Sequence, residues 1–250
     1  MTRRRSKRCR VLLMDDQRQL RNVLGRAIGK KHLVETAASA EEALEKLAAE
    51  RFDLALLDIS MGDGETSGLE CLWQVPSTGH RGTVCILTGY LSCELLHEAL
   101  LAGADDYLIK VSEDRIMAEV NRLAQLGRLP PDKRPRYETI ADMGLLRSLE
   151  MNSDQIALLG RMLRSGFPTQ AELAAEVGIS EKALEARLKR IRNKFGAGNT
   201  TQLARYLVVL GGYVRHSRLE WGEGETDIAP LIEGATLIGR PLGGRRKEGG

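Results

Sequence analysis

The chain has 250 residues, of which 42% are hydrophobic and 28% are charged, and this is the composition of an ordinary soluble protein. That length allows two compact domains of about 100–150 residues each. The 37 basic and 34 acidic side chains leave a net charge of only +3, which says little about partners. No segment has the apolar length of a membrane span or of a secretory signal, so we expect no membrane partner and a cytoplasmic location.

Cysteine, histidine and the basic N-terminus give no functional assignment. The four cysteines form no CxxC pair, and the four histidines lack metal-ligand spacing, which fits a reducing compartment. Six of the first ten residues are basic. We interpret this segment as a solvated leader, although an arm that contacts phosphate groups is the alternative.

Residues 10–127 alternate short apolar runs with amphipathic segments, which is the pattern of a parallel α/β sheet. We expect strands at Arg10–Met14, Leu33–Thr36, Leu54–Leu57, Val84–Leu87 and Tyr107–Ile109. Helices are expected at Gln17–Ile28, Glu41–Ala49, Gly68–Gln74, Ser92–Ala102 and Glu113–Leu126. Five such units in succession predict one doubly wound domain.

The second half of the chain changes character. Residues 128–150 are rich in proline and charge and should form a linker. Its second half, Tyr137–Glu150, is a candidate connecting helix, although its helical periodicity is weak. Residues 151–214 show four helical stretches with glycine-containing turns, which predicts a small all-α helix-turn-helix domain. Thr169 with Glu172, and Ser180, are expected helix caps. The glycine-rich residues 215–250 are expected to be disordered.

Polar side chains stand at the carboxyl ends of the expected strands, the edge at which parallel sheets bind ligands. Asp15 and Asp16 follow the first strand, and Asp58 follows the third. Thr88 follows the fourth strand and Lys110 ends the fifth. Three neighbouring carboxylates repel one another unless a cation lies between them, and an oxygen-rich site suits Mg²⁺.

Four motifs contain these residues: Val-Leu-Leu-Met-Asp15-Asp16, Leu-Ala-Leu-Leu-Asp58, Ile-Leu-Thr88 and Gly103-Ala-Asp-Asp-Tyr-Leu-Ile-Lys110. In order and spacing they resemble the receiver domain of bacterial response regulators over residues 10–127. The resemblance implies a flavodoxin-like, five-stranded parallel fold. It also implies that Asp58 accepts a phosphoryl group from a histidine kinase, a phosphotransfer protein or a small phosphodonor.

The resemblance assigns further roles to the residues around Asp58. Asp15, Asp16, Asp58 and the main-chain carbonyl of Ser60 would hold Mg²⁺. Thr88 and Lys110 would contact the phosphoryl group. Thr88 and Tyr107 would form the switch, in which Tyr107 moves inward after phosphorylation. The receiver would transfer only its own phosphoryl group, and we do not expect an enzyme.

Two positions depart from the family pattern. Gly62 follows Met61 where the family usually has proline, and the loop up to Gly68 is about two residues longer than usual. Val111 replaces the proline that usually follows the lysine, and a cis bond before valine would cost about 3 kcal/mol. These departures leave open whether phosphorylation is required for signalling.

The helical half resembles the LuxR/NarL type of helix-turn-helix, mainly over Gly178–Gly196. Leu184, Leu188 and Ile191 recur at helical spacing and are expected in the core. The resemblance implies binding to double-stranded DNA through Lys182, Glu185, Ala186, Arg187, Lys189 and Arg190. Glu185 stands where the family often has lysine, so base preference is expected to differ.

Two other functions are compatible with a receiver followed by a helical domain. The first is a receiver-containing adaptor whose helical domain binds protein. The second is an enzyme, which we set aside because no nucleotide-binding glycine motif is present and Asp58-Ile-Ser60 lacks the second carboxylate of haloacid-dehalogenase-type phosphatases. We also expect a homodimer after phosphorylation, through a face that contains Leu95, Leu96, Tyr107, Ile116 and Val120.

Overall fold

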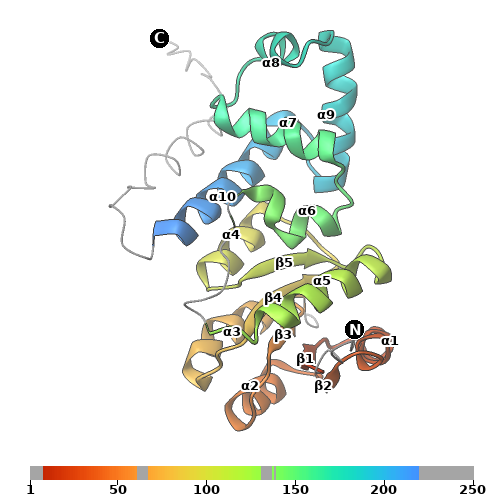
Figure 1. The fold of residues 1–250 in the computed structure, drawn as a ribbon, viewed down its shortest axis with the longest axis vertical. Coiled ribbons are helices and arrows are strands. Elements are labelled where there is room, and N and C mark those ends of the chain that lie inside the picture. The colour runs from red at the N-terminus through yellow and green to blue at the C-terminus, as the bar shows by residue number, and fades with distance from the viewer. Residues whose placement is uncertain (1–7, 61–66, 131–136, 138, 220–250) are drawn as a thin grey trace, which may run out of the picture. The chain divides into compact units, whose positions relative to one another are not determined.

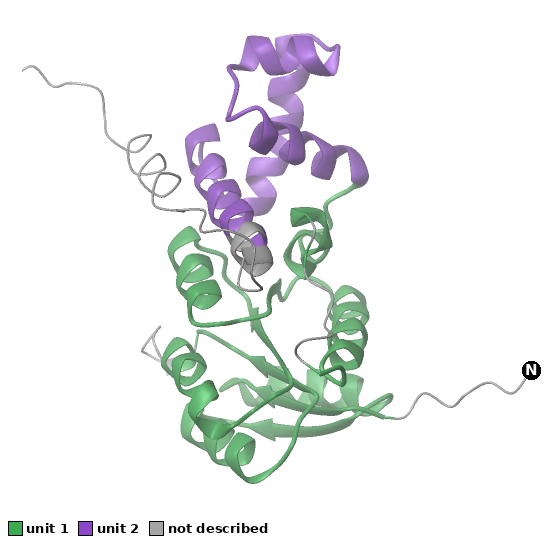
Figure 2. Ribbon diagram, turned by 60° about the vertical axis from the view of Figure 1, so that its left-hand side comes forward, with its two compact units in different colours: residues 1–152 green, residues 153–250 purple. Residues whose placement is uncertain are grey.

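The computed structural model describes residues 8–60, 67–130, 137 and 139–219. The basic leader up to residue 7, the loop around Gly62 and residues 220–250 of the expected tail lie outside this part. The chain divides into two compact units, Met1–Asn152 and Ser153–Gly250, shown in green and purple in Figure 2. A search of the described residues finds no helix with the length and apolar character needed to cross a membrane.

The first unit is built on a five-stranded parallel sheet with the order β2-β1-β3-β4-β5 (Figure 1). The strands are β1 Arg10–Met14, β2 Leu33–Ala37, β3 Leu54–Leu57, β4 Thr83–Thr88 and β5 Asp106–Ile109. Met14 pairs with Leu57, so the residues that follow them emerge side by side at one edge of the sheet. The predicted flavodoxin-like architecture is confirmed.

Helices cover both faces of this sheet. They are α1 Arg18–Gly29, α2 Ala40–Ala49, α3 Ser67–Gln74, the 3-10 helix η1 Val75–Thr78, α4 Cys93–Leu101 and α5 Glu113–Leu126. α1 and α5 pack together on one face, and α2, α3 and α4 follow one another on the other (Figure 1). Because both faces are covered, every residue of β3 and β4 is buried, which explains why β3 is apolar throughout and β4 is apolar between its terminal threonines.

The first unit continues beyond α5. The short helix α6, Gly144–Ser148, packs on β5 and α5, and the 3-10 helix η3, Ile140–Asp142, packs on α6. Leu145 and Leu146 are fully buried there. This segment falls in the second half of the expected linker, and periodicity gave only a weak signal because neither element spans two helical turns.

The prediction that an apolar face of the first unit is available for dimerisation is wrong for the residues that we named. Leu96, Tyr107, Ile116 and Val120 are all buried within the unit, and Leu95 is partly buried. Ile116 and Val120 lie one helical turn apart on the side of α5 that faces the sheet, where they join the hydrophobic core. Apolar spacing on an amphipathic helix marks its packing face rather than a free surface.

The second unit contains the expected helices: α7 Ser153–Arg164, α8 Gln170–Val177, α9 Glu181–Phe195 and α10 Thr200–Leu219. The predicted capping box of Thr169 and Glu172 is present, and Ser180 caps α9 through its hydroxyl. Gly178 ends α8 in the left-handed conformation at φ 72°, which suits glycine. Helix, tight turn and helix in this order are the arrangement of a helix-turn-helix.

Candidate functional site

Three carboxylates meet at the carboxyl ends of β1 and β3. The main-chain N–H of Asp58 donates to Met14 O at 3.0 Å, which fixes the two strand ends beside each other. Asp15, Asp16 and Asp58 each offer an oxygen, and these oxygens lie within 4.8 Å of one another. Asp15 is 0% exposed and Asp58 is 2% exposed, so water screens their repulsion poorly. The sequence prediction that these three side chains share a site is supported by this geometry.

Lys110 reaches into the same site from the end of β5. Its Nζ donates to Asp15 Oδ2 at 2.7 Å and to Asp58 Oδ2 at 2.5 Å, and the lysine side chain is only 8% exposed. One buried ammonium therefore bridges two buried carboxylates. The residues that end β1, β3 and β5, which lie far apart in the sequence, form one charge cluster.

The carboxylate of Asp58 is held at both oxygens. Oδ1 accepts the main-chain N–H of Ser60 at 3.0 Å, while Oδ2 accepts from Lys110. Burial raises the pKa of Asp58 above its ordinary value of 3.8, and the bonds from Lys110 and Ser60 oppose that rise. A carboxylate with two fixed oxygens presents one orientation to a reacting group.

The donor set fits a hard divalent cation. Three carboxylates against one ammonium leave an excess of negative charge in a largely buried place, which a cation such as Mg²⁺ would offset. Asp15 is oriented for this by the main-chain N–H of Gln17, which donates to its Oδ1 at 2.9 Å. This acidic triad is typical of the Mg²⁺ site of a receiver. The part assigned to the Ser60 carbonyl stays a prediction.

The loop after Lys110 contains valine in place of the family's usual proline, and its peptide bond is trans. The described residues contain no cis peptide bond, so the bond between Lys110 and Val111 is trans. The main-chain N–H of Lys110 donates to Thr88 O at 2.8 Å, and that of Val111 to Ile109 O at 2.9 Å. Although Val111 stands where the family usually has proline, the Lys110 ammonium reaches both carboxylates.

Thr88 and Tyr107 are linked through the loop that follows β4. Thr88 Oγ1 lies 3.4 Å from Ser60 Oγ and accepts the main-chain N–H of Tyr90 at 3.3 Å. Tyr107 is fully buried, and its hydroxyl donates to Tyr90 O at 3.0 Å. Thr88 and Tyr107, the two proposed switch residues, therefore both form a hydrogen bond with the main chain of Tyr90, and the Tyr107 side chain lies in the interior. Their role as a switch stays a prediction.

Gly68 makes a close approach that Asp58 requires. A Cβ at this position would lie 2.1 Å from Asp58 O and 2.5 Å from Ile59 Cα, and neither backbone atom can move away cheaply. We therefore expect Gly68→Ala to displace Asp58 and to slow its phosphorylation about a hundredfold, the usual cost of misplacing a reacting group by about 1 Å. The rate can be measured with acetyl phosphate and Mg²⁺.

Gly89→Ala is the matched control. Gly89 follows Thr88 at the same edge of the sheet, and a Cβ there would have no neighbour within 4 Å. Its phosphorylation rate should stay close to that of the wild type. Equal rates in the two variants would show that the contact between Gly68 and Asp58 does not matter.

In the second unit, α9 presents a basic surface. Lys182, Ala186, Arg187, Lys189 and Arg190 are exposed, whereas Leu184, Leu188 and Ile191 are fully buried, as predicted. The buried stripe therefore holds the helix, and the basic residues lie on its free side. That these exposed residues contact DNA remains a prediction.

Glu185 differs from the other residues expected to face DNA. Its Oε1 accepts from Arg192 Nη2 at 2.6 Å, and its Oε2 accepts from Gln170 Nε2 at 2.5 Å. Arg192 also donates to Thr200 Oγ1 at 3.1 Å, so this chain of polar contacts joins α8, α9 and the start of α10. Glu185 is partly buried and serves as a cross-link between helices, a contact that helical spacing alone could not reveal.

The structure also adds a polar cluster that sequence reasoning missed. Asp106 and Glu119 are buried acids of β5 and α5, and they bind Arg122 and Arg147. Asp106 lies inside the motif that ends at Lys110, but nothing in the sequence placed Arg147 beside Glu119. Such pairs depend on tertiary contact.

Comparisons with known proteins agree with this architecture. The family model of the response regulator receiver domain matches residues 11–121. The chain is 30% identical over 206 residues to the DNA-binding transcriptional activator DevR/DosR of Mycobacterium tuberculosis, covering 78% of this chain and 92% of that protein. It is 32% identical over 201 residues to the transcriptional regulatory protein UhpA of Escherichia coli, covering 78% and 95%.

A crystal structure of a receiver domain protein (CheY-like) from Methanospirillum hungatei is 29% identical, with a TM-score of 0.45, and the match covers 48% of this chain and 97% of that one. The sheet order and the acidic triad are those of a receiver domain. The chain belongs to the response regulator family of two-component signalling, with a receiver domain followed by a helical region.

Proposed function

We propose that this protein is a DNA-binding transcriptional regulator controlled by phosphorylation of Asp58. The observation that carries the proposal is the buried Asp58 carboxylate, which is bridged to Asp15 by Lys110 at the carboxyl edge of the sheet. A histidine kinase or phosphotransfer protein would supply the phosphoryl group. The same acidic triad would hold the Mg²⁺ ion that supports transfer.

Transfer requires one bond to form and one to break. An oxygen of the Asp58 carboxylate attacks phosphorus, and the bond from phosphorus to the donor histidine breaks with its electron pair left on the imidazole. Lys110 then pairs with the phosphoryl oxygens, and the Thr88 hydroxyl donates to one of them. A bound Mg²⁺ would neutralise charge on the transferring group, with Asp15 and Asp16 as its ligands.

The helical unit supplies the proposed output. The exposed side of α9 carries four basic residues that can contact phosphate groups and base edges of double-stranded DNA: Lys182, Arg187, Lys189 and Arg190. One relative is described as a DNA-binding transcriptional activator. Because one helix-turn-helix reads only a half-site, we expect the phosphorylated protein to bind as a homodimer.

Selection of DNA from a random pool by the full-length protein, with and without acetyl phosphate, tests this proposal. We expect one enriched motif with two half-sites and stronger enrichment when Asp58 is phosphorylated. A protein that is phosphorylated but enriches no sequence would instead support an adaptor whose helical unit binds protein.

The proposed DNA contact also predicts a salt dependence. Lys189→Ala should weaken binding to all sequences alike and should lower the slope of log affinity against log salt by about 1, because one fewer counterion is released. Fluorescence anisotropy at several salt concentrations measures both quantities. The matched control is Lys31→Ala, which removes an exposed lysine of the first unit. The same slope in both variants would exclude Lys189 as a phosphate contact.

A further inference from the structure

Strand β5 is held from two sides by different parts of the chain. At its carboxyl end, Lys110 joins it to the carboxylates of the acidic site. Along its outer edge lie residue 137 and residues 139–151, which we call the strap. β5 is the last strand of the sheet, so its outward main-chain groups have no neighbouring strand to pair with. The strap provides a partner for one of them, the main-chain N–H of Ile109.

The first contact of the strap is with the start of β5. Asp106 is fully buried, and its Oδ2 accepts from Gly144 N at 2.8 Å and from the Tyr137 hydroxyl at 2.5 Å. Arg122 of α5 donates to the same oxygen at 2.8 Å. A buried carboxylate is stable only when donors surround it, and two of these three donors belong to the strap. Docking of the strap therefore stabilises this end of the strand.

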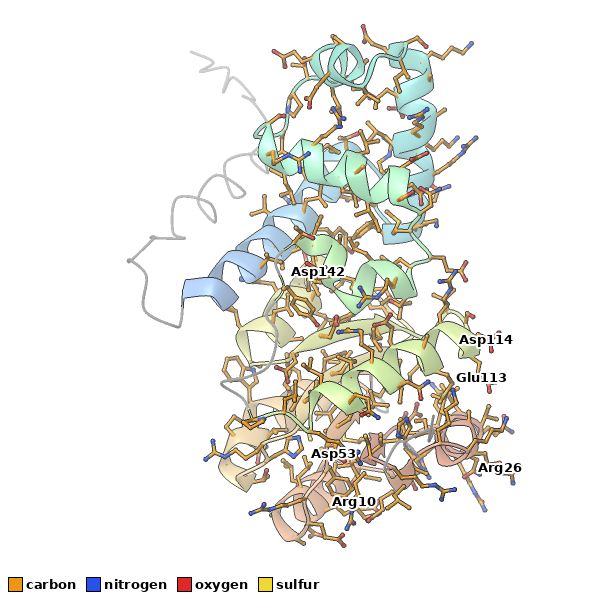
Figure 3. The ribbon with its side chains drawn as sticks, in the orientation of Figure 1. Arg10, Arg26, Asp53, Glu113, Asp114 and Asp142 are labelled. Carbon is orange, nitrogen blue, oxygen red and sulfur yellow. The ribbon has the colours of Figure 1, made fainter. Side chains whose placement is uncertain are left out.

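The second contact ties the strap to α5. Arg147 donates to Glu119 from Nε to Oε1 at 2.5 Å and from Nη2 to Oε2 at 2.9 Å, a bidentate pair. Arg147 also donates to Ala141 O at 3.2 Å and Asp142 O at 2.9 Å, which fixes η3 against α6. Figure 3 labels Asp142 in this segment. The strap is thus held as one piece.

The third contact reaches the residue next to Lys110. Ser148 is fully buried, and its hydroxyl accepts the main-chain N–H of Ile109 at 3.1 Å and donates to Leu145 O at 2.8 Å. Ile109 and Lys110 are consecutive residues. Ile109 is bonded to α6 through its main-chain N–H, and Lys110 is bonded to Asp58 through its side chain.

We propose that Ser148 is a positioning residue that couples the state of the acidic site to the strap. This inference rests on the proposed function of Asp58 as phosphoacceptor. A phosphoryl group on Asp58 brings new anionic oxygens beside the Lys110 ammonium, which then pairs with them. The backbone of Ile109 and Lys110 adjusts with it, and the hydroxyl of Ser148 passes this adjustment to α6.

The end of the strap is built to pass such an adjustment onward. Met151 N donates to Leu146 O at 3.1 Å and Glu150 N donates to Arg147 O at 3.0 Å, so the chain stays bound to α6 as far as Met151. The backbone of Glu150 is in the left-handed region at φ 54°. A residue other than glycine is strained there and keeps this conformation because the surrounding structure imposes it. Since α7 begins at Ser153, only Asn152 separates the strap from the second unit.

Hydrogen exchange of the full-length protein tests the coupling. Peptides that cover residues 143–151 are compared in Mg²⁺ alone and in Mg²⁺ with beryllofluoride, a mimic of the phosphoryl group. In the wild type we expect the mimic to change their exchange rate about fivefold or more, the lower end of ordinary allosteric coupling. In Ser148→Ala this change should disappear, although basal exchange of the strap is faster.

The matched control is Ser112→Ala, because Ser112 is a serine close to Lys110 in the sequence whose side chain makes no cap hydrogen bond to α5. This variant should keep the response of the strap to the mimic. A merely structural role for Ser148 would raise exchange in both conditions and would leave their ratio unchanged.

The outcomes separate this inference from the proposed function. Protection of the peptide that contains Asp58 reports that the mimic binds. If it binds and the strap of the wild type does not respond, the coupling is refuted while Asp58 remains the phosphoacceptor. A full response in Ser148→Ala refutes the role of that residue. If the mimic does not bind at all, the proposed function fails and the coupling fails with it.

Discussion

Replacing Asp58 with asparagine should abolish phosphorylation. The side-chain amide is a far weaker nucleophile than a carboxylate, and the change also removes the charge that pairs with Lys110. Among the described carboxylates, only Asp58 lies at the end of β3. It accepts a hydrogen bond from Lys110, and it is linked to Thr88 through Ser60, which contacts both. Incubation with acetyl phosphate and Mg²⁺, followed by intact-mass and peptide mass spectrometry, measures the label.

Asp114→Asn is the control for this experiment. Asp114 is an exposed carboxylate in the first turn of α5 (Figure 3), and its replacement should leave the label unchanged. Label that persists undiminished in Asp58→Asn would refute the assignment of the phosphoacceptor.

The pH dependence of the same reaction follows from burial of Asp58. Burial holds the pKa of its carboxyl above the ordinary value of 3.8, against the opposing effect of Lys110. The attacking form is the carboxylate, so at limiting Mg²⁺ the rate should fall as the pH drops through this raised pKa, at a higher pH than for a solvent-exposed aspartate. A bound Mg²⁺ would favour the charged form and shift the decline to lower pH.

Leu145→Ala should destabilise the first unit by about 2–5 kcal/mol, which is the usual cost of truncating a buried leucine. Leu145 lies in α6 and is 0% exposed, so its replacement leaves a cavity in a packed core. Residues in a solvated linker would give almost no effect. Urea unfolding of the full-length protein, followed by circular dichroism, measures the change in the free energy of unfolding.

Leu129→Ala provides the comparison within the same expected linker. Leu129 follows α5 and is 41% exposed, so its truncation should cost no more than about 0.5 kcal/mol. If both variants unfold at the wild-type urea concentration, α6 does not contribute to the stability of the unit.

The amino-acid sequence determined the elements whose signals are local. Short apolar runs indicated all five strands, and the signal is clearest in β3 because a parallel strand buried on both faces needs continuous apolar residues. Capping residues such as Thr169 and Ser180 marked helix starts, because their side chains bond to backbone a few residues away. The carboxylates of the site could also be predicted, because parallel strands all end at the same edge.

What depended on pairing across the fold could not be predicted. The strap was assigned to a linker, since η3 and α6 are too short to show a helical period and are held by Arg147 on Glu119 and Ser148 on Ile109. The bonds of Glu185 to Gln170 and Arg192 could not be read from helical spacing either, and its expected contact with DNA stays a prediction. The supposed dimer face proved to be core, because an apolar stripe has the same spacing whether it meets a partner or its own sheet.

The sequence by itself thus determined the succession of strands and helices along the chain, the acidic edge of the sheet and the basic character of α9. These features depend on local residue spacing and on the common direction of the strands. Only the tertiary structure decided which charges pair, which apolar residues are buried and which segment covers the edge of β5. These depend on distances between residues far apart in the chain, and such distances are set by the packing of the whole unit.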